Sequence, residues 1–141
     1  DPDNSHVVGA LLARLHEARE NDEPSVTVWG TGSPRREFLY VDDLASACIH
    51  VVQNVTGVEI VNLAGGPSLS IAELAERLKA VTGYEGELVF DAARPDGMPL
   101  KALDAAPLLA TGWRPQFDFD RGLVLTYDWF LEHRVNRFAH A

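Results

Sequence analysis

The chain has 141 residues, is 46% hydrophobic, and carries a formal net charge of −9 with a pI near 4.9. This length allows one buried core and argues against two independent domains. The acidic balance excludes a general affinity for nucleic acid or for an anionic membrane, because both require a basic surface. The single cysteine, Cys48, excludes an internal disulfide, and no apolar run is long enough to cross a bilayer, so we expect a cytoplasmic protein.

The first expected element is an amphipathic helix that Asn4 or Ser5 caps and that ends at residues 21–24. His6 and Arg14 lie eight residues apart on it, so their azimuths differ by about 80° and their heights by about 12 Å. Both side chains could border one elongated groove. The alternative for His6 is an ordinary capping or surface histidine.

Residues 26–43 combine two strand-forming runs, a glycine turn, two adjacent arginines and a helix cap, which no other segment of the chain does. We expect a strand at Val26–Trp29, a turn at residues 30–32 and a second strand at residues 37–41. Arg35 and Arg36 follow the glycine turn directly, and a planar guanidinium matches phosphate oxygens, so the pattern indicates a local anion site. The alternative is a solvated hairpin tip. A dinucleotide fingerprint fits poorly, because Arg35 occupies the place of the third glycine and the turn leads into a strand.

Further elements follow towards the C-terminus. We expect a helix capped by Asp42 with Cys48 on its buried side, a short strand at residues 59–63, and a helix that opens with a capping box at residues 70–73 and ends at Gly83. Another strand at residues 87–91 precedes a Pro-Asp-Gly turn at residues 95–97. A short helix ends at residues 111–113, a closing helix follows Pro115, and the tail from Arg134 looks frayed.

Four runs in the sequence resemble one enzyme family. They are Asn-Ser-His-Val at residues 4–7, Val-Trp-Gly-Thr-Gly-Ser-Pro-Arg-Arg-Glu-Phe-Leu-Tyr-Val-Asp-Asp at 28–43, Arg-Pro-Asp-Gly at 94–97 and Gly-Trp-Arg-Pro at 112–115. Together they are similar to the C-terminal part of the GDP-L-fucose synthases, which are extended short-chain dehydrogenases/reductases. The Arg-Glu-Phe-x-x-Val-Asp-Asp portion is shared more widely among nucleotide-sugar enzymes.

The resemblance implies an α/β fold in which residues 1–141 form a single substrate-binding domain fragment, with short strands, about five helices and the Rossmann cofactor half mostly absent. It implies part of an enzyme that converts GDP-4-keto-6-deoxy-D-mannose to GDP-L-fucose with NADPH, by epimerisation at C3 and C5 and reduction at C4. NADP would be bound mainly by the missing N-terminal half. The full-length parent would be a homodimer.

The resemblance also assigns residue roles. His6 corresponds to the histidine at the epimerisation and cofactor site, where an imidazole can exchange a proton near neutral pH. Arg14, Trp29, Arg36 and Asp96 correspond to substrate-binding positions, and no metal ligand is implied. Lys101 is a weaker candidate for the same pocket. The alternative for Trp29 is packing in the core.

The departures from the family pattern limit the expected activity. The chain has no glycine-rich phosphate loop, and no tyrosine is followed by lysine four residues later. Cys48 stands in the wrong place for the family's active-site cysteine. We therefore expect the isolated chain to be inactive. Two alternatives stay open, a fragment of another NDP-sugar epimerase or dehydratase, and a non-catalytic module that binds nucleotide sugars or pairs subunits.

Overall fold

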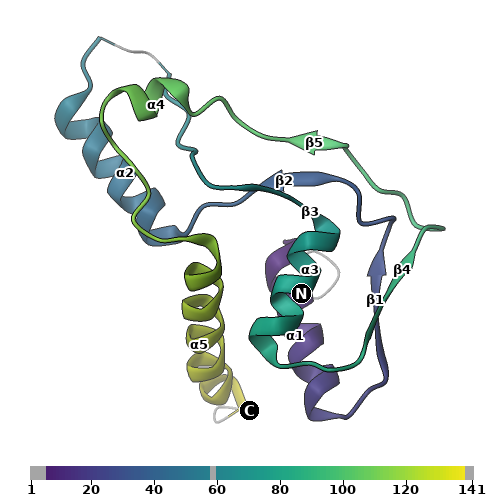
Figure 1. Ribbon diagram of the computed structural model, residues 1–141. Coiled ribbons are helices and arrows are strands. Elements are labelled where there is room, and N and C mark those ends of the chain that lie inside the picture. Colours follow the sequence, from purple (N-terminus) through teal and green to yellow (C-terminus); the bar gives the residue numbers. More distant parts are fainter. Residues whose placement is uncertain (1–5, 58–59, 139–141) are drawn as a thin grey trace.

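The computed structural model describes residues 6–57 and 60–138, and from residue 134 onward it describes the helix backbone alone. The elements in chain order are α1 (Val7–Glu20), β1 (Ser25–Trp29), β2 (Arg35–Glu37), α2 (Val41–Asn54), β3 (Ser68–Ser70), α3 (Ile71–Thr82), β4 (Glu87–Asp91), β5 (Leu100–Lys101), α4 (Ala106–Ala110) and α5 (Phe119–Phe138) (Figure 1). The α/β fold with short strands and five helices is thus confirmed.

The strands form two small sheets. β1 pairs in parallel with β4, whereas β2 lies between β3, its antiparallel neighbour, and β5, its parallel neighbour. The alternative of a hairpin tip is therefore excluded, because β1 and β2 belong to different sheets. The chain changes sheet through Gly30 and Gly32, whose φ angles of 84° and 77° lie in the left-handed region that favours glycine.

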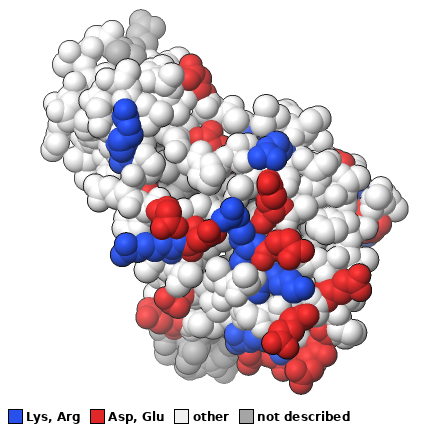
Figure 2. Space-filling view, viewed as in Figure 1, with Lys and Arg blue, Asp and Glu red and all other residues white. Residues whose placement is uncertain are grey.

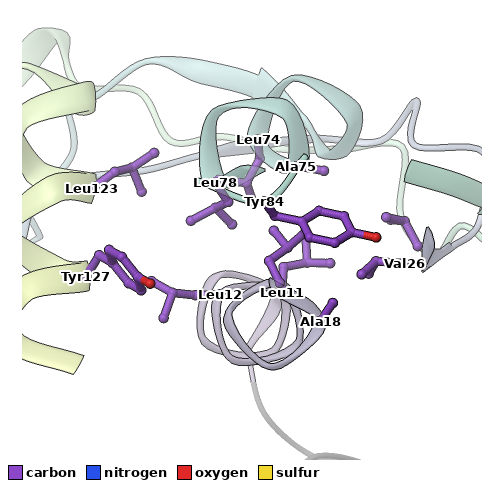
Figure 3. Close-up of a cluster of buried hydrophobic side chains, with 12 residues drawn as sticks. Leu11, Leu12, Ala18, Val26, Leu74, Ala75, Leu78, Tyr84, Leu123 and Tyr127 are labelled. Carbon is purple, nitrogen blue, oxygen red and sulfur yellow. The ribbon is translucent and has the colours of Figure 1, made fainter. Parts of the chain in front are cut away.

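The main core lies between α1, α3, α5 and the β1–β4 sheet. Figure 3 shows side chains from these elements meeting over α1. The buried members are Leu11, Leu12, Leu15, Ala18, Val26, Val28, Leu74, Ala75, Leu78, Tyr84, Leu123 and Tyr127. The helical members recur every three or four residues and the two strand members every second residue, so each element presents one apolar face to the same interior.

A second, smaller cluster lies where α2 and α4 pack at the opposite end of the molecule from β1 and β4 (Figure 1). It contains Ala47, Leu108 and the indole of Trp113. Buried Asp43 connects this region to the start of α5, because its carboxylate accepts hydrogen bonds from the backbone N–H groups of Gln116 and Phe117 at 2.7 and 3.2 Å.

Asp42 does not cap α2, and the expected strand at residues 37–41 is shorter than predicted. The N-cap position is Tyr40, and the helix begins at Val41. β2 ends at Glu37. The N–H of Phe38 still donates to the carbonyl of Pro67, the residue before β3, but proline has no N–H to return the bond, so the pairing stops there and the chain turns towards α2. Residues 38–40 therefore belong to neither a sheet nor a helix, and Val41 is already the first residue of α2.

Three other expectations also fail. Cys48 is exposed, because α2 packs through Ala47 and Val51 and leaves the neighbouring apolar side of the helix open. The expected strand at residues 59–63 does not form over residues 60–63, and residue 59 lies outside the described residues. The tail is helical as far as Phe138, and residues 139–141 lie outside the described part.

The predicted end of α1 and both predicted limits of α3 agree with the structure. α1 ends at Glu20, but its N-cap position is His6 instead of the expected Asn4 or Ser5, which lie outside the described residues. The capping box of α3 is complete, since the Ser70 hydroxyl accepts from the N–H of Glu73 and the Glu73 carboxylate accepts from the N–H of Ser70. Among the described helices, none is both long and apolar enough to span a membrane.

Candidate functional site

The site is built where residues 29–36 meet residues 91–99. The N–H of Gly30 donates to the carbonyl of Asp91 at 2.9 Å, which extends the β1–β4 pairing by one residue. After the turn, the N–H of Arg35 donates to the carbonyl of Pro99 at 2.8 Å. These two backbone bonds hold the loop between β4 and β5 against the loop between β1 and β2.

Asp96 lies at the centre of this contact. Its two carboxylate oxygens accept hydrogen bonds from Thr31, one from the backbone N–H at 2.6 Å and one from the hydroxyl at 2.8 Å. A β-carbon added at Gly30 would lie 2.4 Å from Oδ1 of Asp96. Gly30 is therefore required twice, for its left-handed backbone and for the close approach of the carboxylate.

Trp29 is 57% exposed, so its packing in the core is excluded. The guanidinium carbon of Arg94 lies 4.8 Å from the centroid of the indole ring, which is a cation–π geometry. Nε of Arg94 also lies 3.8 Å from a carboxylate oxygen of Asp91. An exposed indole with a cation over it is a surface on which a planar or apolar ligand group can pack.

The neighbouring arginines make contacts on different elements. Nη1 of Arg36 donates to the carbonyls of Met98 and Arg35 at 2.8 and 2.7 Å, so this half-buried side chain braces the loop that carries Asp96. Arg35 instead donates to the carbonyl of Ser68 and, at 3.2 Å, to the carboxylate of Glu73.

Arg35 forms an ion pair with Glu73, so its side chain has a structural contact. The hydrogen bonds from Ser70 hold the pKa of the Glu73 carboxyl below its usual value, and the positive charge of Arg35 lowers this pKa further. Arg35 therefore faces a carboxylate that is already fixed at the start of α3. Arg36 faces backbone carbonyls and has five N–H donors in total, which leaves capacity for an anion.

The remaining predicted residues lie along α1. Nη2 of Arg14 donates to the carbonyl of Thr27 at 2.5 Å, two residues before Trp29. His6 is exposed at the N-cap position, where its carbonyl accepts from the N–H of Ala10 and its imidazole makes no capping bond. The structure thus places Trp29, Arg36 and Asp96 on the two segments that backbone bonds join, and Arg14 beside β1. Within the described ranges, no hydrogen bond joins His6 to any of these four.

Two hollows in the described structure are candidates for a ligand. One, of about 510 Å³, is lined by Lys101 together with Glu37 and Met98, so Lys101 borders the loop that Arg36 braces. Another, of about 370 Å³, is lined mainly by apolar residues of α1, α5 and the segments around residues 38–41 and 65–67. Its walls offer no cation, so it does not suit a diphosphate.

Charges of both signs alternate on the face seen in Figure 2, and Lys and Arg do not form a continuous basic patch there. Among residues 6–57 and 60–138, no three His, Cys, Asp or Glu side chains are grouped so that they could hold a metal ion. An anion on this face would therefore have to be bound by individual arginines and not by a broad positive field.

Sequence reasoning missed Thr31 and Arg94. Both stand beside residues that it identified, Thr31 between the two turn glycines and Arg94 at the start of the Arg-Pro-Asp-Gly run. It also missed His16, a buried histidine whose Nδ1 lies 2.8 Å from the hydroxyl of Tyr127 in the main core. The partners of Thr31 and His16 lie 65 and 111 positions away, so no local pattern predicts them.

Comparisons with known proteins show which proteins the chain resembles as a whole. Residues 1–64 match the model of the NAD dependent epimerase/dehydratase family. The chain is 49% identical over 136 residues to GDP-L-fucose synthase 1 of Arabidopsis thaliana, covering 96% of this chain and 42% of that protein. It is 45% identical over 142 residues to the GDP-L-fucose synthase of Escherichia coli, covering 94% of this chain and 44% of that protein.

Among solved structures, a GDP-L-fucose synthetase from Naegleria fowleri bound to NADP is similar with a TM-score of 0.87 and 27% identity, covering 95% of this chain and 42% of the other. The predicted resemblance to GDP-L-fucose synthase is therefore confirmed. The chain spans less than half the length of these relatives.

Replacing Gly30 tests the local geometry. Gly30→Ala should lower the free energy of unfolding by about 1–2 kcal/mol, because alanine is strained at positive φ and its methyl group displaces the Asp96 carboxylate. Gly9→Ala is the control, since Gly9 lies within α1 with nothing near its added β-carbon. It should raise the same free energy by up to about 1 kcal/mol. Urea unfolding measures both, and a neutral Gly30→Ala would contradict the described turn.

Proposed function

We propose that this chain is the substrate-binding part of a GDP-L-fucose synthase, an enzyme that converts GDP-4-keto-6-deoxy-D-mannose to GDP-L-fucose. The observation that carries the proposal is the cluster of Trp29, Arg36 and Asp96 on two loops that backbone bonds hold together. The similarity to GDP-L-fucose synthases along nearly the whole chain supports it. Residues 1–141 would form a single domain fragment of the full-length enzyme.

Arg36 is the residue we assign to the diphosphate. Its guanidinium is fixed by the carbonyl of Met98 before any ligand arrives, so little side-chain freedom is lost on binding. A charge-assisted hydrogen bond from a preorganised arginine to a phosphate oxygen is among the stronger single contacts in proteins. Arg14 is assigned to the same substrate from the other side of Trp29, where it is anchored on Thr27.

Trp29 and Asp96 are assigned to the uncharged parts of the nucleotide sugar. The exposed indole offers an apolar surface for a sugar or base. The Asp96 carboxylate, held by two donors from Thr31, retains lone pairs that can accept from ligand hydroxyl or N–H groups. The acceptor and the cation are thus placed at the same loop contact.

His6 is assigned to proton transfer at the epimerised carbons, because an imidazole gives and takes protons near neutral pH. NADPH supplies the hydride for reduction at C4. It would be bound mainly by the N-terminal half of the full-length enzyme, with His6 contributing at the cofactor site. The 141 residues alone would be inactive.

Two other functions can be separated from this one. Another NDP-sugar epimerase or dehydratase would accept a different nucleotide, and a non-catalytic module would bind nucleotide sugar without turnover. GDP-L-fucose synthases are the relatives that share 45–49% of aligned residues with the chain, which favours a GDP-sugar. A homodimeric full-length enzyme and a cytoplasmic location follow from the same reasoning and stay predictions.

Substitution of the paired arginines tests the proposal. In the full-length enzyme, Arg36→Ala should weaken GDP binding by about 1.5–3 kcal/mol, which is the usual contribution of a hydrogen bond to a charged group. Arg35→Ala is the matched control and should have little effect on affinity, because Arg35 is engaged with Glu73 and Ser68. Titration calorimetry at fixed salt measures both.

Equal losses at the two arginines would indicate a diffuse basic patch and contradict a specific diphosphate contact. A loss confined to Arg35→Ala would assign the ligand to the side of β3 and α3.

Substitution of the histidine tests its chemical role. His6→Gln in the full-length enzyme should slow solvent deuterium incorporation at the epimerised carbons by about two to four orders of magnitude, the usual contribution of a positioned acid or base. His133→Gln, which changes an exposed histidine of α5, is the control and should leave the rate unchanged. Mass spectrometry of the recovered sugar measures the exchange. Unchanged exchange in His6→Gln would reduce His6 to a capping residue.

A further inference from the structure

The hydrogen-bond network around residue 31 gives one exposed carboxylate a fixed orientation. Asp96 is exposed, yet both of its oxygens accept from the same residue, at 2.6 Å from the Thr31 N–H and 2.8 Å from the Thr31 hydroxyl. Two donors from one residue hold a carboxylate against rotation, whereas a single donor does not.

The donors themselves are preorganised. The N–H of Ser33 donates to Oγ1 of Thr31 at 3.2 Å, so this oxygen already accepts one hydrogen bond. The hydroxyl proton of Thr31 is then available for Asp96 or for Oγ of Ser33, which lies 2.7 Å away. A β-branched threonine also has few side-chain rotamers, so little freedom is lost in fixing it.

We propose that Thr31 is a positioning residue of the substrate site, which sets the orientation of the Asp96 carboxylate towards a sugar or base of the bound nucleotide sugar. This inference rests on the proposed function. Thr31 acts through Asp96 and is not assigned a contact with the ligand.

Neighbouring contacts limit what the loss of this hydroxyl can do. Arg36 still holds the loop at Met98, and the N–H of Arg35 still bonds the carbonyl of Pro99. The backbone N–H of Thr31 would also remain a donor to Asp96. Removal of the hydroxyl therefore frees the carboxylate without detaching the loop, so the effect should fall on substrate affinity and spare the fold.

The test uses three variants of the full-length enzyme. Thr31→Val removes the hydroxyl at nearly constant shape, whereas Thr31→Ser keeps a hydroxyl at this position. Thr56→Val, which changes an exposed threonine after α2, is the control. We expect Thr31→Val to raise KM for GDP-4-keto-6-deoxy-D-mannose about tenfold with kcat within about twofold, because a carboxylate that is free to rotate must be ordered when the substrate binds. The lost hydrogen bond lies on the exposed surface, so the variant should stay fully folded at the assay temperature. Thr31→Ser and Thr56→Val should resemble the unsubstituted enzyme.

A double-substitution cycle shows whether the effect passes through Asp96. Thr31→Val should add almost nothing to KM when Asp96 is already alanine. An unchanged KM in Thr31→Val, a failure of Thr31→Ser to restore it, or additive effects in the cycle would each overturn the inference.

A crystal structure of the Thr31→Val protein provides a readout that does not depend on turnover. A rotated Asp96 carboxylate supports the positioning role, and an unmoved one overturns it. If the unsubstituted enzyme does not turn over the GDP-sugar, the proposed function fails, and this structure still decides the role of Thr31.

Discussion

The geometry of the site depends on the left-handed backbone at Gly30 and Gly32. These two residues follow β1 and lead the chain into a different sheet instead of back along β1 as a hairpin. Added β-carbons would lie 2.4 Å from the Asp96 carboxylate at Gly30 and 2.6 Å from the ring of Phe90 at Gly32. The turn therefore has no room for side chains at these two positions. Because glycine has none, Phe90 and the loop of residues 94–99 can approach the turn.

Two adjacent arginines then serve different purposes. Arg35 is paired with Glu73, whose carboxylate also completes the cap of α3, so this cation helps to join β2 and β3 to the helix. Arg36 is held by the carbonyl of Met98 and lies in the same loop contact as Asp96. On a chain with a net charge of −9, an arginine held in place in this way would select an anion more specifically than a general positive field.

The sequence predicts best what is encoded locally. The capping box at residues 70–73 and the left-handed glycine that ends α3 follow from residues within a few positions of one another, and both are confirmed. The cluster of Trp29, Arg36 and Asp96 could be named from the family resemblance, although the loop contact that brings them together could not be described.

The failures concern long-range packing. Cys48 was expected in the core because one side of α2 is apolar, but an apolar helix side is buried only where another element covers it, and in the described structure that side is exposed. The hairpin alternative failed because strand propensity in residues 26–29 and 37–41 does not specify which strands pair. β1 pairs with β4, about sixty residues further along the chain, and β2 pairs with β3 and β5.

The central claim is that the contact between the turn of residues 29–36 and the loop of residues 94–99 binds the nucleotide sugar. A crystal structure of the full-length enzyme with GDP tests it most directly. The account predicts diphosphate oxygens within hydrogen-bond distance of the Arg36 guanidinium, with Arg35 still paired to Glu73. A GDP molecule bound elsewhere, with Arg36 bonded only to Met98 and Arg35 as it is without ligand, would contradict it.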